Sequence, residues 1–540
     1  MAINKTKETK TSTHLNYMHG ESYDINNPLT KLKVAASSCF FGEPMYYQPL
    51  EEGQKRSQKN NSSIIRRSVL SESDREMLAA ELNAIDPKDW RSMTPASLLE
   101  KAIDDALDFN PEETLKFAAH LRNAENIRTT PQVILVRASM HPKVKGTDLV
   151  SKYGPQILRR TDETTVQAAY FGQKYSPTSS KIRKIPGSLK KLWARHLQSK
   201  NTYDLAKYQM SSRGVKLVDV VNLCHPKVTP AIDALVKGSL SNEGNTWEAV
   251  VSKEGSTKES WEKSIDVMGH MALLRNLRNL ESKGVDPDKF LKKLVDGAPT
   301  GKQLPFRYYS AYRALGDSIS PRFQDALEEC MKASLGNLPK FGKTISLVDN
   351  SGSAHGALTS EYGTVKVSDI ANLTGVLTAM QSDDGYVGVF GDRLKIMPIM
   401  KSGSILQQHA NVCEVGKGIG GSTENGIWLF FDDAINKKTS YDSIFIYSDM
   451  QAGHGGLYGV NPNQYKDYRW NRTNNINVAK LVSKYRKEVN PNAFVFMIQV
   501  AGYQDSLIPE FYDRSYILGG WSGNVLHFAN SMITLYGNKQ

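Results

Sequence analysis

Cysteine is scarce in this 540-residue sequence, which contains four of them: Cys39, Cys224, Cys330 and Cys413. They lie far apart and none belongs to a C-x-x-C pair, which argues against a disulfide framework or a cysteine zinc site and favours a reducing compartment. The sequence also lacks any run of about 20 apolar residues, the length that a membrane-spanning helix needs. Its first residues, MAINKTKETK, have no apolar core, so we expect no signal peptide, no membrane partner and a cytoplasmic protein.

Motifs for several common kinds of catalysis are missing as well. The sequence has no G-x-x-x-x-G-K-[ST] loop, no G-x-S-x-G elbow and no H-E-x-x-H pair, which argues against P-loop, serine-hydrolase and zinc-protease chemistry. Residues 416–421 satisfy G-x-G-x-x-G, but they do not follow the first strand of an α/β unit, and 401–415 is a poor strand. A dinucleotide site there is disfavoured.

Acidic residues are in the minority only in the first part of the chain. There are 68 Lys and Arg against 56 Asp and Glu, a net charge of +12. Residues 341–540 hold 17 of each sign, so the first 340 residues carry the whole excess. The length, with 40% apolar and 23% charged residues, predicts two or three globular domains. The first part alone has the charge to bind a polyanion.

Helix-start patterns recur in the first part. Thr94-Pro95, Asn110-Pro111 and Thr130-Pro131 each place a polar residue before a proline, where the side chain can cap the free amides of the first turn and the proline has no amide hydrogen to lose. Apolar residues then recur at helical spacing. Short connections between such helices predict helical hairpins stacked into an α-solenoid, although no clean sequence repeat is present.

The densest positive segment spans residues 181–218, with ten basic residues and one acid, Asp204. Trp193, Tyr203 and Tyr208 are interleaved with them. Basic side chains neutralise phosphates, and aromatic rings can stack on unpaired bases. The pattern is typical either of a nucleic-acid surface or of a solvated helix face, and both readings stay open. Charge alone selects as candidate ligands of the polyanion Arg183, Lys184, Lys190, Lys191, Arg213 and Lys216.

The second part alternates short apolar runs with helical patterns. Runs that are apolar throughout are typical of strands buried on both faces, so we expect a doubly wound, mostly parallel α/β sheet. The expected strands are 344–348, 386–390, 394–399, 443–447 and 493–500, and the expected helices are 364–380, 423–435, 476–488 and 525–536.

Oxygen-bearing side chains follow the expected strands. Asp349, Ser351 and Ser353 form a D-x-S-x-S pattern after the first strand, Thr423 opens a later helix, and Asp449 ends another strand. Ligands gather beyond the carboxyl ends of parallel strands, and a set of only oxygen ligands suits a hard divalent cation, for which we expect Mg²⁺. Taken singly, each element is also compatible with an ordinary capped turn. Ser351 has no histidine placed to activate it as a nucleophile.

Together these residues resemble the Ro autoantigen, or TROVE-domain, family and its bacterial relatives. The D-x-S-x-S, GGST and S-D elements are similar to the metal-ion-dependent adhesion site of the von Willebrand factor A domain in that family. In the first part, the similar blocks are FGEPMYY at 41–47, KIPGSLKK at 184–191, LAKY at 205–208, VKLVDVV at 215–221 with HPK at 225–227, ALLRNL at 272–277 and LPFR at 304–307.

The resemblance implies a ring of HEAT-like helical repeats closed by a metal-bearing domain. The implied organisation is a flexible polar tail at 1–28, a helical ring at 29–340 and a von Willebrand factor A-like domain at 341–540. By position, Lys207 and His225 match family residues that contact Y RNA, the small structured RNA bound on the outer surface.

The family's partners are also implied by the resemblance alone. In the family the ring takes single-stranded 3′ ends of misfolded noncoding RNAs, and bacterial members use the bound RNA to tether an exoribonuclease, polynucleotide phosphorylase. A monomer is expected.

Three functions remain open at this stage. The first is an RNA-binding ribonucleoprotein component in RNA quality control, and the second is a cation-dependent protein-interaction scaffold to which RNA is incidental. The third, a metal-dependent enzyme, is disfavoured because no base or extra carboxylate accompanies the cation ligands, so no catalytic residues are assigned.

Overall fold

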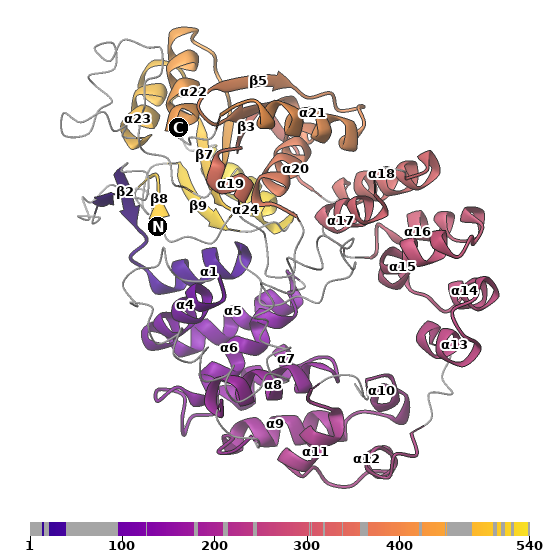
Figure 1. Cartoon of the computed structure of the whole chain (residues 1–540). Coiled ribbons are helices and arrows are strands. Elements are labelled where there is room, and N and C mark those ends of the chain that lie inside the picture. The colour runs from indigo at the N-terminus through magenta and orange to yellow at the C-terminus, as the bar shows by residue number, and fades with distance from the viewer. Residues whose placement is uncertain are drawn as a thin grey trace.

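The computed structural model describes most of the chain (Figure 1). The described residues are 13–15, 21–38, 95–125, 127–177, 182–208, 214–240, 246–301, 303, 305–316, 319–336, 338–356, 365–420, 424–448, 450, 478–500, 505–508, 514–519 and 523–537. In this part of the chain no helix is both long and apolar enough to span a membrane.

The first part of the chain is helical, as predicted. Its first arm consists of α1 (Pro28–Ser38), α4 (Pro95–Phe109), α5 (Pro111–Asn123), α6 (Thr129–Met140), α7 (Leu149–Ile157), α8 (Glu163–Tyr175), α9 (Gly187–Gln198), α10 (Thr202–Lys207), α11 (Leu217–Cys224) and α12 (Pro230–Val236). Its second arm consists of α13 (Trp247–Glu254), α14 (Lys258–Ile265), α15 (His270–Ser282), a short 3₁₀ turn (Pro287–Lys289), α16 (Leu291–Gly297), α17 (Pro305–Leu315) and α18 (Pro321–Leu335).

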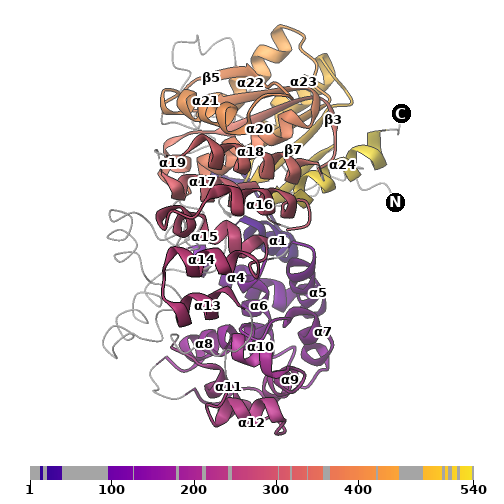
Figure 2. The ribbon, with the colours of Figure 1, turned by 90° about the vertical axis from the view of Figure 1, so that its right-hand side faces the viewer.

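The helices of the first arm stack in two rows. α5, α7 and α9 contact one another in sequence along one row, while α6, α8 and α11 do so along the other. Figure 2 shows α5, α7 and α9 together along one edge of the molecule. Between the rows lies one continuous core that includes Leu121, Ile134, Phe171 and Trp193. This arrangement is the α-solenoid that the sequence predicted.

Helix capping follows the prediction at one site and departs from it at another. The Asn110 side chain accepts a hydrogen bond from the Glu113 amide at 3.1 Å and caps α5. Thr130 does not cap a helix, because α6 already begins at Thr129 and its hydroxyl is buried within the first turn. The third expected cap, Thr94, lies outside the described residues.

The second part is an α/β domain with a six-stranded sheet. The strands are β3 (Phe341–Asp349), β4 (Ser382–Phe390), β5 (Leu394–Pro398), β6 (Ser443–Ser448), β7 (Phe494–Gln499) and β9 (Ser515–Gly519), in the order β5-β4-β3-β6-β7-β9. All neighbours are parallel except β5, which runs antiparallel to β4. The helices are α19 (Gly352–Gly356), α20 (Val367–Met380), α21 (Ile405–Lys417), α22 (Glu424–Asn436), α23 (Val478–Glu488) and α24 (Gly523–Gly537).

Two joints hold the two helical arms against the α/β domain, and the described elements follow the course of a ring (Figure 1). At one joint α1 packs on β9 so closely that a Cβ on Gly519 would lie 2.6 Å from the Val34 backbone. At the other, α18 packs on α21, and the buried Glu328 carboxylate accepts hydrogen bonds from the first-turn amides of α21. The two-part fold, a helical ring with an α/β domain, is therefore confirmed.

The tail expected to be flexible contains two strands. β1 (Thr13–Leu15) pairs with β2 (Glu21–Asp24), and β2 pairs with β8 (Asp505–Ser506) near the end of the chain. Tyr23 packs into the same apolar cluster as Leu507. Polar strands of three or four residues carry no clear sequence pattern, so this part of the expectation for residues 1–28 was wrong. The domain boundary at 340/341 stays a prediction, although α18 ends at Leu335 and β3 begins at Phe341.

Candidate nucleic-acid interface

Helix α9 presents a basic face to solvent because its apolar residues all point into the solenoid. Leu189, Leu192, Trp193 and Leu197 are buried, whereas Lys191 is exposed. The Trp193 indole donates a hydrogen bond of 2.6 Å to the buried Gln167 side chain. Trp193 is thus a core residue, and the expectation that its ring could stack on bases was wrong.

The structure brings most of the predicted RNA-binding residues onto consecutive elements. Arg183 and Lys184 lie in the irregular segment before α9, Lys190 and Lys191 lie on α9, Lys207 ends α10, and Lys216 and His225 flank α11. All are exposed except Lys190, which is half-buried. Arg213 lies outside the described residues. Within the described part of the chain, none of these lysine and arginine side chains forms an ion pair with a carboxylate, so their charge is available to a polyanion.

Two tyrosines lie beside Lys207. Its ammonium group is 5.7 Å from the ring centre of Tyr203 and 5.7 Å from that of Tyr208. Tyr203 is 47% exposed, whereas Tyr208 is held by Arg160, whose guanidinium lies 5.0 Å from the ring centre and donates to the hydroxyl at 3.0 Å. Tyr203 therefore combines an exposed ring with a neighbouring cation, the arrangement that stacks unpaired bases.

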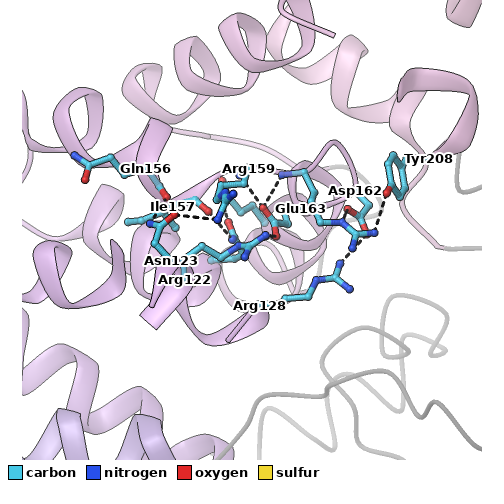
Figure 3. Close-up of polar contacts among 12 residues, drawn as sticks. Arg122, Asn123, Arg128, Gln156, Ile157, Arg159, Asp162, Glu163 and Tyr208 are labelled. Carbon is cyan, nitrogen blue, oxygen red and sulfur yellow. Dashed lines mark hydrogen bonds and ion pairs between the residues drawn. The ribbon is translucent and has the colours of Figure 1, made fainter. Parts of the chain in front are cut away.

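Arg159 and Arg160 were missed by the sequence reasoning, because they lie well before the 181–218 segment. They occupy the turn between α7 and α8, which the buried Glu163 carboxylate organises (Figure 3). Glu163 accepts from the backbone amides of Arg159 and Arg160 at 2.8 and 2.9 Å and from the Arg122 Nε at 2.9 Å. The adjacent Arg-Arg pair in the sequence was the only signal for these residues.

The ionisable side chains packed beneath this turn are affected by burial and by one another. Desolvation lowers the pKa of the Arg122 guanidinium, and Glu163 opposes that shift. Asp162 accepts from Arg128 at 2.9 Å and from the Arg160 Nε at 3.0 Å. Glu163 and Asp162 are thus engaged by Arg122, Arg128 and Arg160 and by the backbone of the turn. Among the described residues they form no ion pair with the predicted RNA-binding cations.

The predicted metal site lies at the switch point of the sheet, where the chain passes from one side of β3 to the other. Asp349, at the carboxyl end of β3, is fully buried, and burial raises the pKa of its carboxyl group. Its oxygens accept from the Ser351 amide at 2.9 Å and from the hydroxyl of Ser448, the last residue of β6, at 2.6 Å. Ser351 is also buried.

The remaining predicted ligands are not described. Thr423 and Asp449 lie outside the described residues, as does the side chain of Ser353. The described residues contain no cluster of three or more His, Cys, Asp and Glu side chains suited to a metal ion. Asp449 directly follows Ser448, whose hydroxyl contacts Asp349, so the structure brings the two strand ends together but leaves the five-residue ligand set a prediction.

Comparison with known proteins supports the resemblance. A family model described as the TROVE domain matches residues 237–396, which span the second helical arm and the first strands of the sheet. This segment of the chain is therefore similar to the TROVE domain. The crystal structure of the Deinococcus radiodurans RO (RSR) protein aligns with this protein with a TM-score of 0.52 at 14% identity, over 80% of this chain and 93% of that chain. This likeness shows that the two share a fold. No curated protein matches the chain.

The G-x-G-x-x-G sequence at residues 416–421 has a structural explanation. Residues 405–417 form helix α21, where the sequence offered only a poor strand, so Gly416 lies in the last turn of a helix and Gly418 follows it. A Cβ on Gly416 would lie 2.2 Å from the Asn350 Oδ1, and Asn350 and Asn372 exchange side-chain hydrogen bonds of 2.8 and 2.9 Å. Gly416 therefore permits the close approach of α21 to this buried amide pair.

Proposed function

We propose that this protein is a TROVE-domain, RNA-binding ribonucleoprotein component. The observation that carries the proposal is the surface formed by the segment before α9 together with α9, α10 and α11, hereafter the α9–α11 surface. It carries exposed cations that form no ion pair with a carboxylate among the described residues, and one of them, Lys207, lies beside the exposed ring of Tyr203. Release of counterions from phosphates supplies affinity for any RNA there, and stacking on Tyr203 favours an unpaired base.

In this proposal the bound RNA is a small structured noncoding RNA of the Y type. Single-stranded 3′ ends of misfolded noncoding RNA enter the ring, and an exoribonuclease such as polynucleotide phosphorylase acts with the complex in RNA quality control or degradation. The curved course of the two helical arms, each joined to the α/β domain (Figure 1), supports a ring that can encircle a strand. The protein acts in the cytoplasm as a monomer without catalysis of its own.

A divalent cation, Mg²⁺ in our proposal, is held by Asp349, Ser351, Ser353, Thr423 and Asp449. The donor set fits the ion, because Asp349 is a buried carboxylate that meets only hydroxyl and amide donors among the described residues. A bound cation offsets the cost of burying that charge. It also supplies a Lewis-acidic position for an acidic ligand.

The same feature supports a second candidate function, a cation-dependent protein-interaction scaffold to which RNA is incidental. Its specific support is the place of Asp349 at the switch point of the sheet, where ligands of α/β domains bind. Recovery of the same protein partners after nuclease treatment, and their loss for Asp349→Ala, favours this second function.

Sequencing of RNA crosslinked to the protein in its native cell tests the leading proposal. We expect enrichment of one or a few structured noncoding RNAs, with crosslinks mapping to the α9–α11 surface. Recovery of RNA in proportion to its cellular abundance, with no preferred species, contradicts the proposal.

A further inference from the structure

A pocket of about 400 Å³ lies between α7 and α9, in the row that these helices share. Its lining residues from α9 and the residue after it fall at positions 188, 191, 192, 195, 196 and 199, the spacing of one helical face. Those from α7 and the two residues that follow fall at 151, 155, 158 and 159. The pocket is therefore a product of how two neighbouring helices pack, and a volume of this size accommodates a small organic ligand.

The charge of the pocket has one sign. Arg159, Lys191, Arg195 and Lys200 line it, and no carboxylate does. Arg159 and Lys200 make local hydrogen bonds, to the Asn123 side chain at 3.1 Å and to the Arg159 carbonyl at 3.3 Å. The side chains of Lys191 and Arg195 have neither a hydrogen bond nor an ion pair within the described part of the chain, and both residues are exposed. These two cations are free to bind an anionic group.

The rest of the lining is suited to more than a lone ion. Pro155, Leu158 and Leu192 provide an apolar wall, and Ser151 and Ser188 add hydroxyl groups. His196 also lines the pocket, and its buried Nε2 has no hydrogen-bond partner among the residues that the structure describes. A buried polar atom normally has a partner. A ligand or solvent molecule in the pocket supplies one.

We propose that the α7/α9 pocket binds a nucleotide, with its phosphate at Lys191 and Arg195 and its base or sugar against the apolar wall. Arginine and lysine are the side chains that recognise phosphate, and an apolar surface beside them suits the remainder of a nucleotide. The nucleotide is either free in solution or part of a bound RNA strand. The RNA case rests on the proposed function, whereas the free-nucleotide case does not.

The test uses the full chain and two variants of different kinds. Lys191→Ala with Arg195→Ala removes the two free cations, whereas Ser151→Trp fills the pocket without changing charge. The matched control is Lys253→Ala with Lys258→Ala, which removes two exposed lysines from the second arm. Thermal melts establish that each variant is folded. Calorimetric titration with adenosine 5′-monophosphate, inorganic phosphate and adenosine then measures the free ligands, and a structured RNA with a single-stranded tail measures the polymer.

For a free nucleotide, we expect the monophosphate to bind at least tenfold more tightly than adenosine, and both pocket variants to lose at least tenfold in affinity while the control does not. For a nucleotide within RNA, we expect the pocket variants to weaken RNA binding by at least tenfold relative to the control. The inference is overturned if wild type, both pocket variants and the control bind the free ligands and the RNA equally well. It is also overturned if wild type does not bind the monophosphate and the pocket variants bind RNA as tightly as wild type does. If wild type binds the monophosphate in the pocket but binds no RNA, the inference stands and the proposed function fails.

Discussion

The Glu328 carboxylate on α18 accepts a hydrogen bond of 3.0 Å from the Leu406 amide in the first turn of α21. The Ile405 amide and the Ser404 hydroxyl donate to the same carboxylate. A side chain of the helical part thus caps a helix of the α/β domain, where the positive end of the helix dipole favours an anion. This single buried carboxylate helps to hold one joint of the ring closed.

Replacement of Glu328 is expected to destabilise the ring. Because hydrogen bonds to a charged group contribute about 1.5 to 3 kcal/mol, Glu328→Ala is expected to lower the free energy of unfolding by at least that amount. Urea denaturation measures it. The control Glu329→Ala removes the adjacent, exposed carboxylate. Equal stability of the two variants contradicts the proposed role of Glu328 at the joint.

A larger loss in the free energy of unfolding is expected when Glu163, which is buried beneath the Arg159-Arg160 turn, is replaced. Loss of one member of a buried ion pair costs about 3 to 5 kcal/mol, and Glu163→Gln leaves the Arg122 guanidinium without its anion. Chemical denaturation should show a loss of this size. The surface pair of Glu113 and Lys116, both half-exposed, provides the control, since Glu113→Gln is expected to cost less than about 1 kcal/mol. If Glu163→Gln and Glu113→Gln lower the free energy of unfolding by similar amounts, the buried pair of Glu163 and Arg122 stabilises the fold no more than a surface pair does.

His196 is expected to make stability depend on pH. Burial lowers its pKa from 6.5 to about 4, and Lys200 adds to the shift while Asp204 opposes it. Between these values the unfolded chain binds more protons than the folded chain, so stability falls as the pH drops from 6.5 towards 4. The stability of wild type relative to His196→Gln should therefore decrease across this interval and stay constant above it. Parallel pH profiles for the two proteins contradict the assignment.

Cation binding at Asp349 can be tested through stability. Without divalent cation, Asp349→Asn is expected to equal or exceed wild type in melting temperature, because it removes a buried charge. Addition of Mg²⁺ should raise the melting temperature of wild type and of the exposed control Asp384→Asn, but not that of Asp349→Asn, since a ligand that binds the folded state stabilises it. An equal response to Mg²⁺ in all three proteins excludes Asp349 as a ligand.

The sequence correctly predicted those helices and strands whose local residue pattern reflects their burial or capping in the fold. The apolar runs at 443–447 and 493–500 became β6 and β7 because both faces of the central sheet are covered, and Asn110 caps its helix as expected. Trp193 was misjudged because its neighbours in sequence are basic, while its contact with Gln167 depends on packing between helices. The pairing of β2 with β8 joins residues almost 500 positions apart, which no local pattern reveals. For the candidate site, charge identified Lys191 but not Arg159, which only the packing of α7 on α9 brings beside it.

The most direct test of RNA binding is an affinity titration at several salt concentrations. The RNA is a structured transcript with a single-stranded 3′ tail, and wild type is compared with Lys207→Ala/Lys216→Ala and with the control Lys253→Ala/Lys258→Ala. We expect wild type and control to bind with the same steep salt dependence, and the first double variant to bind more weakly, with a salt slope lower by about one unit for each lost phosphate contact. Identical affinity and slope for the three proteins, or no binding by wild type at moderate salt, contradicts the account.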